Sequence, residues 1–244
     1  MTMQKPIRLI ELFAGYGSQA LALKYLGIPF EHHFVCEFDK YAMQSYNDIH
    51  GTSFETSDVK DIHASDINIT DTDKYVYVLT YSFPCTDLSL AGLRKGMQRD
   101  SGTSSSLLWE VERILSECKE SSDLPQYLLM ENVPQVVAKD NIRLFSEWTQ
   151  FLADLGYVSQ YKILNAKDFG VPQNRERCFM VSILKSENRQ FVFPSPRPLD
   201  IRLKDVLQDS SEVDEKYYIN TEKANDLIQR LIDDGTLDEE MECL

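Results

Sequence analysis

Two residues that could do covalent chemistry follow two strand-like segments of this chain. Cys85 comes after the apolar run Tyr75–Tyr81 and the loop residue Pro84, and Glu131 directly follows the apolar residues 128–130. Active sites of open α/β sheets collect at the carboxyl ends of strands, so both side chains are expected at one sheet edge. A thiol can attack an electron-poor ring carbon while a carboxyl protonates the ring nitrogen. The pair therefore favours an enzyme that acts on a cytosine ring.

Both residues also have simpler interpretations. A lone cysteine is most often a buried structural thiol, and Glu131 could cap a helix. Cys85 is interpreted as a nucleophile because it follows a proline at a strand end and precedes a polar loop, 86–103. Asn132 and Pro134 would form a tight turn directly after Glu131, which favours a functional role for the carboxyl.

A glycine-containing segment, Phe13–Ser18, lies between the first expected strand and the first expected helix. Glycines let the backbone approach a ligand, and a helix N-terminus favours a carboxylate or phosphate. Glu37 ends the next strand about 20 residues later, where an acidic residue commonly binds ribose hydroxyls. The usual third glycine is absent, so a nucleoside without pyrophosphate, such as S-adenosylmethionine, fits better than NAD. A purely structural turn is the alternative.

Two further sets of polar residues could serve the same site. Asp58, at the end of an expected third strand, could hold an adenine amino group, with Asp61 a weaker candidate. Arg175 and Arg177 alternate in an extended segment and would share one face, which suits a carboxyl partner, a base edge or a phosphate. Solvated loop acids and a solvated charged edge are the respective alternatives.

Strand-like and helix-like segments alternate along most of the chain. This order predicts an α/β fold with a mainly parallel, Rossmann-like sheet and helices on both faces. Asp39 is placed to cap one of the helices. The expected strands are 7–12, 34–37, 54–59, 75–81, 126–130, 157–164 and 178–184, and the expected helices are 19–26, 40–47, 106–119 and 141–155.

The character of the sequence changes after the proline-rich stretch 193–198. We therefore expect a catalytic and cofactor-binding domain over residues 1–198 and a separate acidic segment over residues 199–244. Residues 200–244 hold 14 acidic and 5 basic residues, and the whole chain has a net charge of −14. Proteins that grip nucleic acid on their own are usually basic, so strong independent binding is not expected.

Bulk composition narrows the class of protein further. The 244 residues, 43% of them hydrophobic, suffice for one α/β domain of ordinary size. No apolar run approaches the roughly 20 residues that span a bilayer, and no signal peptide precedes the first strand, so a cytoplasmic protein with no membrane partner is expected. Five widely spaced cysteines without a CxxC pair argue against a disulfide framework and a zinc site.

Taken in order, these segments resemble the cytosine-5 DNA methyltransferase family, in the style of bacterial and phage restriction-modification enzymes. The matching stretches are Phe13–Gly17, Pro84-Cys85, Glu131–Val133 and Gln173–Arg177, which agree with the family in order and spacing. The resemblance implies methylation of cytosine C5 in duplex DNA, with S-adenosylmethionine as the cofactor and no metal ion.

The resemblance also implies a role for each matching residue. The target cytosine flips out of the duplex, Cys85 adds to C6, and Glu131 holds and protonates N3. Arg177 is expected to contact the flipped base, and Arg175 to anchor the site around the nucleophile. Phe38 and Val59 would flank the adenine of the cofactor. The residues that match the cofactor pocket are Glu11, Phe13, Gly15, Tyr16, Gly17, Glu37, Phe38, Asp58, Val59 and Pro84.

Three features depart from the family pattern. Thr86 stands where glutamine is usual, and 103–106 carries no arginine before the following helix. The family continues into a target-recognition domain and a final helix that completes the cofactor site, and the residues after 198 are too few for both. Residues 203–218 resemble the approach to that domain. The chain is therefore expected to lack most of its recognition region.

Several explanations and functions stay open at this point. A second polypeptide could supply recognition, the chain could be a truncated relic, or it could be a fragment of a longer product. The chain could also be an inactive or partner-dependent DNA-modification subunit that binds cofactor only. Methylation of cytosine in RNA by the same chemistry is the remaining alternative.

Overall fold

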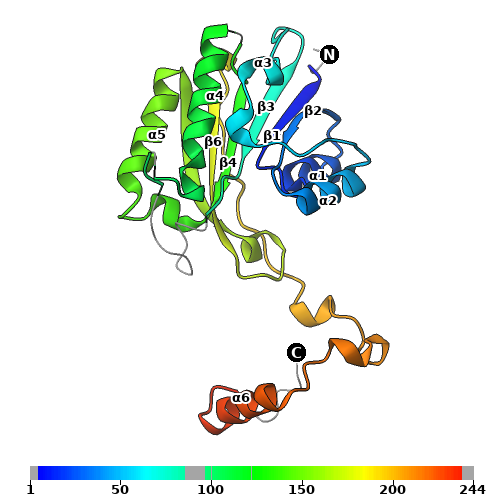
Figure 1. The fold of residues 1–244 in the computed structure, drawn as a ribbon. Coiled ribbons are helices and arrows are strands. Elements are labelled where there is room, and N and C mark those ends of the chain that lie inside the picture. Colours follow the sequence, from blue (N-terminus) through cyan, green and yellow to red (C-terminus); the bar gives the residue numbers. More distant parts are fainter. Residues whose placement is uncertain (1–4, 86–96, 100, 122, 238–244) are drawn as a thin grey trace. The chain divides into compact units, whose positions relative to one another are not determined.

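A computed structural model describes residues 5–85, 97–99, 101–121 and 123–237 of the chain. The chain divides into two compact units, the first formed by residues 1–164 and 176–194 and the second by residues 165–175 and 195–244. Figure 1 shows the chain coloured along its sequence. All the predicted site residues except Arg175 belong to the first unit.

The first unit is built on a six-stranded sheet. Its strands are β1 (Ile7–Leu12), β2 (Phe30–Cys36), β3 (Val76–Tyr81), β4 (Tyr127–Asn132), β5 (Tyr157–Asn165) and β6 (Glu176–Leu184). Their order is β2-β1-β3-β4-β6-β5. β1 pairs in parallel with β2 and β3, β3 pairs in parallel with β4, and β6 runs antiparallel to β4. The prediction of a mainly parallel sheet is confirmed.

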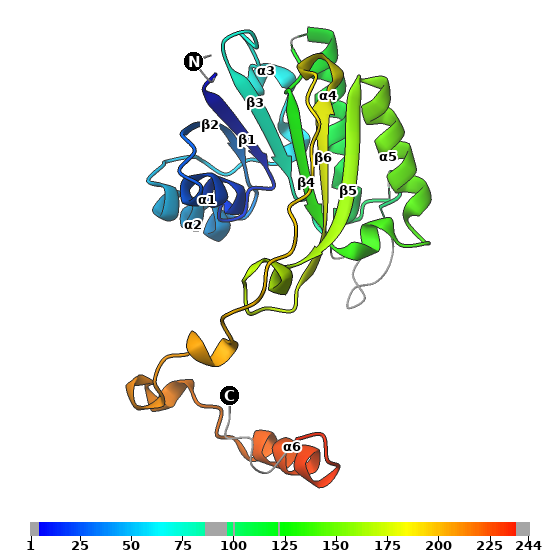
Figure 2. The same ribbon diagram turned by 180° about the vertical axis from the view of Figure 1, so that it is seen from behind.

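Helices lie on both faces of this sheet, as predicted (Figures 1 and 2). They are α1 (Ser18–Tyr25), α2 (Lys40–His50), α3 (Ala64–Ile67), α4 (Leu108–Ser121) and α5 (Ile142–Asp154). Asp39 caps α2 as expected, because its Oδ1 accepts hydrogen bonds from Tyr41 N at 2.8 Å and Ala42 N at 2.9 Å.

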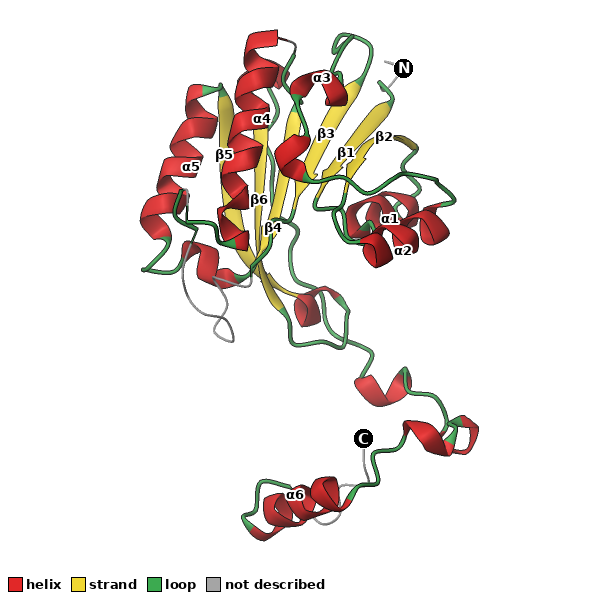
Figure 3. Ribbon diagram, viewed as in Figure 1, coloured by secondary structure: helices red, strands yellow, loops and turns green. Residues whose placement is uncertain are grey.

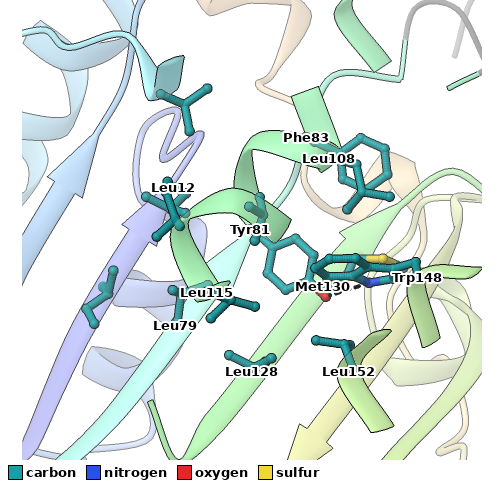
Figure 4. Packing of buried hydrophobic residues seen from close by; sticks show 14 of the residues in the cluster. Leu12, Leu79, Tyr81, Phe83, Leu108, Leu115, Leu128, Met130, Trp148 and Leu152 are labelled. Carbon is teal, nitrogen blue, oxygen red and sulfur yellow. Dashed lines mark hydrogen bonds between the residues drawn. The ribbon is translucent and has the colours of Figure 1, made fainter. Parts of the chain in front are cut away.

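The main hydrophobic core lies between the sheet and helices α4 and α5 (Figure 4). Val111, Ile114, Leu115 and Cys118 recur at helical spacing along α4, and all four are buried. Trp148 of α5 is fully buried and donates its Nε1–H to the Tyr81 hydroxyl at 3.1 Å. Since truncating such a side chain costs about 3–5 kcal/mol, this layer fixes α5 on the sheet.

The opposite face of strands β3, β4 and β6 is apolar but much less covered. Side chains alternate between the two faces of a strand, and Val76, Val78, Leu129 and Val181 line a hollow of about 1020 Å³ on this side. In the view from behind, no helix lies in front of these three strands (Figure 2). This hollow is larger than a second cavity, of about 640 Å³, that Pro84 lines, although the hollow holds none of the predicted site residues.

The strand expected at 54–59 is wrong. The chain there forms no strand and ends in a single 3-10 turn, Val59–Asp61, so that the connection from α2 to α3 is mostly loop (Figure 3). Side chains replace the ladder partners that a strand would need: Asn47 bonds Phe54 through both its N–H donor and its oxygen, at 2.9 Å each. Only Phe54 and Val59 of this segment are apolar, so it lacks the alternation that is typical of a half-buried strand.

Up to residue 237, where the described part of the chain ends, the second unit contains short 3-10 turns and one α-helix, α6 (Glu222–Asp233). Its two sequence segments are joined by Arg197, whose Nε donates to the Phe169 carbonyl at 2.8 Å and whose N–H donates to the Asp168 carbonyl at 2.8 Å. The division of the chain falls before Ser195 and also assigns 165–175 to this unit, a segment that the sequence pattern placed in the first.

Candidate active site

The Cys85 segment and the Glu131 segment meet at one edge of the sheet. Tyr81 at the end of β3 is in register with Met130 of β4, the residue before Glu131. Asn132 joins the two segments, because its Nδ2 donates to the Phe83 carbonyl at 3.0 Å. This side chain is 3% exposed, and its Oδ1 accepts from Val133 N at 2.8 Å. The sequence indicated only a turn at Asn132 and did not predict its hydrogen bond to Phe83.

Cys85 differs from the other described cysteines in its exposure. Cys36, Cys118 and Cys178 are buried, whereas Cys85 is partly exposed. Burial raises the pKa of Cys36 to about 11, and burial together with the charge of Glu131 raises the pKa of Cys178 to about 11. Raised pKa values suppress thiolate at neutral pH. Among the described cysteines, Cys85 is therefore the best placed to react with a ligand.

Glu131 is paired with an arginine from β6. Arg177 Nε lies 3.0 Å from Glu131 Oε1, and both side chains are about one-fifth exposed, at 21% and 24%. The contact arises because β6 runs antiparallel to β4 with Glu131 opposite Phe179, which makes Arg177 a diagonal neighbour. A carboxylate partner for Arg177 was one of the options left open by the sequence.

Arg175 lies in the second unit. Its backbone N–H donates to Asn165 Oδ1 at 3.2 Å, and its carbonyl accepts from Ala166 N at 2.9 Å. Asn165 also donates to Asn174 Oδ1 at 2.8 Å, so this amide shapes the loop that carries Arg175. The catalytic role expected for Arg175 stays a prediction.

A cavity of about 640 Å³ lies beside Pro84 in the first unit. Six of the ten residues predicted to bind the cofactor line it: Phe13, Glu37, Phe38, Asp58, Val59 and Pro84. Phe38 is 76% exposed, so its ring is free to pack on a planar ligand. The wall also includes residues that the sequence did not assign to the cofactor: Cys36, Asp39, Ser57, Lys60, Ser82, Gly102, Thr103, Ser104 and Leu107. They come from several separate segments of the chain, and local pattern carries no signal for such a grouping.

The glycine segment is held tightly at the end of β1. Gly15 N donates to Glu37 Oε2 at 2.8 Å, which joins the segment to the end of β2. Phe13 has a φ of 57°, a left-handed conformation that is rare for a bulky side chain and concentrates at functional sites. A Cβ on Gly17 would come within 2.3 Å of His50 Nε2, so only glycine fits there.

The four other predicted cofactor residues, Glu11, Gly15, Tyr16 and Gly17, do not line the cavity. Glu11 lies beneath the glycine segment, 1% exposed, and its Oε2 accepts from the Tyr46 hydroxyl at 2.5 Å. Tyr46 in turn lies 2.6 Å from His32 Nδ1. Glu11 Oε1 has no hydrogen-bond partner among the described residues. Burial raises the pKa of Glu11 to about 7, against opposing hydrogen bonds from Tyr46 and the Ala20 backbone.

Replacing Glu11 with glutamine is expected to stabilise the fold at pH 8 but not below pH 4.5. The folded state favours the protonated carboxyl, so its contribution is full below about 4.5 and is lost as the pH rises to about 7. The shift corresponds to at most about 3 kcal/mol. Urea unfolding of both proteins between pH 4.5 and 8 measures the difference.

The difference between the two proteins is the informative quantity, because His32 acts in the opposite direction. Burial lowers the pKa of His32 to about 4, so its contribution grows with pH. Glu55→Gln, at an exposed position, serves as the matched substitution control. A Glu11→Gln effect that does not vary with pH would contradict a buried carboxyl titrating near neutrality.

Two kinds of feature, a membrane-spanning helix and a metal-binding cluster, are absent from the described residues. No helix in that part of the chain is long and apolar enough to cross a membrane. Within the same residues, no three His, Cys, Asp or Glu side chains are grouped so that they could hold a metal ion.

Comparison with protein families places this site in context. A family model described as C-5 cytosine-specific DNA methylase matches residues 7–241. The type II methyltransferase M2.ScrFI of Lactococcus lactis subsp. cremoris is 36% identical over 267 residues, covering 90% of this chain and 72% of that protein. The type II methyltransferase M.Bsp6I of Bacillus sp. strain RFL6 is 34% identical and is matched over 66% of its length. The orphan methyltransferase M.SssI of Spiroplasma monobiae is 53% identical over 111 residues, 28% of its length.

Solved structures share the fold at lower identity. The Dnmt2 methyltransferase of S. pombe has a TM-score of 0.64 at 20% identity, covering 91% of this chain and 65% of that one. The methyltransferase EhMeth of Entamoeba histolytica has a TM-score of 0.66 at 18% identity, covering 93% and 66%. This chain thus spans less than two thirds of the length of both structures and of several of its curated relatives, such as M.SsoII of Shigella sonnei at 52%.

Proposed function

Because this chain belongs to the C-5 cytosine-specific DNA methylase family, we propose that it methylates C5 of cytosine in duplex DNA. The observation that carries the proposal is that Asn132 joins the segment of the partly exposed Cys85 to the end of β4, where Glu131 pairs with Arg177, and that a cavity large enough for a nucleoside lies beside Pro84. The thiol supplies a nucleophile, the carboxyl supplies a proton donor, and the guanidinium supplies a partner for a carbonyl oxygen.

The residues around the cavity suit S-adenosylmethionine. Three acidic residues, Glu37, Asp39 and Asp58, outnumber the one basic residue of its wall, Lys60, which favours a cationic ligand. Phe13, Phe38 and Val59 offer apolar surface to an adenine ring. We assign Glu37 to the ribose hydroxyls and Asp58 to the adenine amino group. When bound, S-adenosylmethionine supplies an electrophilic methyl group on a sulfonium centre.

The chain's own residues activate the base. A flipped cytosine enters next to Cys85, and the thiolate forms a bond to C6 while Glu131 delivers a proton to N3. The electron pair that moves to C5 makes that carbon the nucleophile toward the methyl group. Loss of the C5 proton to solvent then breaks the bond from C6 to the Cys85 sulfur and releases the thiolate. The N3 proton returns to Glu131, and the ring is restored as neutral 5-methylcytosine. Arg177, now paired with Glu131, would hold the base through O2, and Arg175 would anchor the loop around the nucleophile.

We further propose that recognition of the target DNA sequence depends largely on residues outside the catalytic domain, 1–198. Residues 199–244 would begin the recognition region, and a second polypeptide or further sequence would supply the rest. The net charge of −14 agrees with this division, because base-reading regions usually carry basic residues. The bacterial cytoplasm, including that of a phage-infected cell, is the proposed setting.

Methyl transfer from labelled S-adenosylmethionine tests the proposal. The 244-residue chain is incubated with unmethylated bacterial genomic DNA or with total RNA, and the label is identified after digestion to nucleosides. Label in 5-methyldeoxycytidine is the expected result. Label in 5-methylcytidine from RNA would favour the RNA alternative. Cofactor binding without transfer to either acceptor would favour a partner-dependent or inactive subunit.

A further inference from the structure

One wall of the cavity is held in place by an arginine from α4. The wall is the segment that turns through Val59–Asp61, which lies outside the sheet and has no strand ladder. Arg113 NH2 lies 3.2 Å from the Val59 carbonyl, 3.3 Å from the Lys60 carbonyl and 2.9 Å from the Ile62 carbonyl. A single guanidinium thus binds three backbone acceptors within four residues.

Two carboxylates orient this guanidinium. Arg113 Nε donates to Glu110 Oε2 at 2.8 Å, and Arg113 NH1 donates to Glu117 Oε1 at 2.7 Å. Glu117 also accepts from Ala64 N at 3.1 Å, immediately beyond the same wall. Arg113 thus binds the backbone up to the Ile62 carbonyl, and Glu117 binds it just after Ile62, at Ala64 N. The side chains of Arg113, Glu110 and Glu117 are each about 30% exposed, so the contacts are not fully screened by solvent.

The facing wall of the cavity belongs to the start of the same helical segment. Gly102, Thr103, Ser104 and Leu107 line the cavity, and Leu107 directly precedes α4. Ser105 Oγ in this stretch donates to the Pro84 carbonyl at 2.8 Å, which joins it to the Cys85 segment. The position of Arg113 on α4 therefore links the Val59 wall to the wall that adjoins the nucleophile.

We propose that Arg113 is a positioning residue, which sets the shape of the cofactor cavity by holding residues 59–62 against α4. The inference rests on the proposed function for the identity of the ligand. A lysine cannot replace the arginine, because an ammonium on a flexible stem lacks the planar fork that reaches several acceptors at once. No part of the role requires Arg113 to touch the cofactor.

Calorimetric binding of S-adenosylhomocysteine to Arg113→Lys and to the unchanged chain tests the inference. The expected result is binding about 10-fold or more weaker in the variant, as for loss of hydrogen bonds to a charged group. Arg143→Lys is the matched control, because Arg143 on α5 also pairs with a glutamate four residues along, Glu147, and lies on the surface. The control is expected to bind within about twofold of the unchanged chain.

Backbone hydrogen exchange separates this role from general stabilisation and does not depend on the ligand. In Arg113→Lys, the amides of Asp61 and Ile62, which bond within the turn, are expected to exchange faster, while those of β1 and β3 do not change. The inference would be overturned if both amides exchanged at the same rate in the variant and the unchanged chain. It would also be overturned if both proteins bound S-adenosylhomocysteine equally well. If the unchanged chain binds no S-adenosylhomocysteine but the variant shows faster exchange at these amides, the cofactor assignment is wrong. Arg113 then still supports this wall. If Arg113→Lys does not fold, Glu117→Gln is the second variant. It weakens the contacts of residue 117 with Ala64 N and Arg113, and it is expected to weaken binding about threefold to tenfold.

Discussion

Cys85→Ser is expected to abolish methyl transfer to DNA, by more than about 10⁴-fold, while the binding of S-adenosylhomocysteine is unchanged. A serine hydroxyl is far less acidic and less nucleophilic than a thiol, so it cannot add to C6 at a useful rate. Cys85 itself lies outside the lining of the cofactor cavity, which is why binding should survive. The measurements are label transfer with time and calorimetric binding, on the same two protein samples.

Covalent trapping gives the sharper form of this test. DNA in which 5-fluorocytosine replaces cytosine is expected to form an irreversible adduct with the unchanged chain, because the fluorine blocks the final elimination. Cys85→Ser should form none. Cys118→Ala, which removes a thiol buried in the core, is expected to form the adduct normally. Retained transfer by Cys85→Ser would show that the chemistry does not pass through this thiol.

Glu131→Gln is expected to lower the transfer rate by about 10²–10⁴-fold with little effect on cofactor binding or on stability. An amide of the same size can still accept a hydrogen bond from Arg177, but it has no acidic proton to give to N3. The partly exposed ion pair contributes at most about 1 kcal/mol, so the fold should hold. Single-turnover transfer at saturating S-adenosylmethionine measures the chemical step.

A matched ion pair elsewhere provides the control for Glu131. Glu147→Gln removes the carboxylate that pairs with Arg143 on α5, away from the cavity, and transfer should stay within about twofold of normal. A Glu131→Gln variant with normal single-turnover transfer would reduce Glu131 to a structural partner of Arg177. Slow adduct formation with 5-fluorocytosine DNA would instead place the defect before methyl transfer, as the proposed proton donation requires.

The two larger predictions rest on different kinds of contact. The prediction for Cys85 rests on its accessibility, which distinguishes it from three buried thiols. The prediction for Glu131 rests on its place beside Arg177, a pairing made by the antiparallel register of β4 and β6. Asn132 supports both, since it ties the end of β4 to the Phe83 carbonyl two residues before Cys85. The reacting groups are thus held by the sheet and by one buried amide.

Most of the secondary structure could be predicted because it depends on short-range order. Apolar spacing in α4 and the Asp39 cap of α2 involve residues at most a few turns apart. The strand expected at 54–59 failed for the opposite reason. Its backbone is held by the Asn47 side chain, by the Glu37 carbonyl and, further along, by Arg113. No local pattern distinguishes a segment held in this way from one held by a strand ladder.

The sequence by itself determined which residues are candidates for chemistry and at which strand ends they stand, because strand alternation and family-like motifs are local properties of the chain. These candidates are Cys85, Glu131 and the glycine segment. Only the tertiary structure decided their partners: Arg177 for Glu131, Asn132 for the Cys85 segment, Tyr46 for the buried Glu11 and Arg113 for the cavity wall. Each of these contacts joins residues far apart along the chain, and packing brings them together through the burial of side chains on both faces of the sheet.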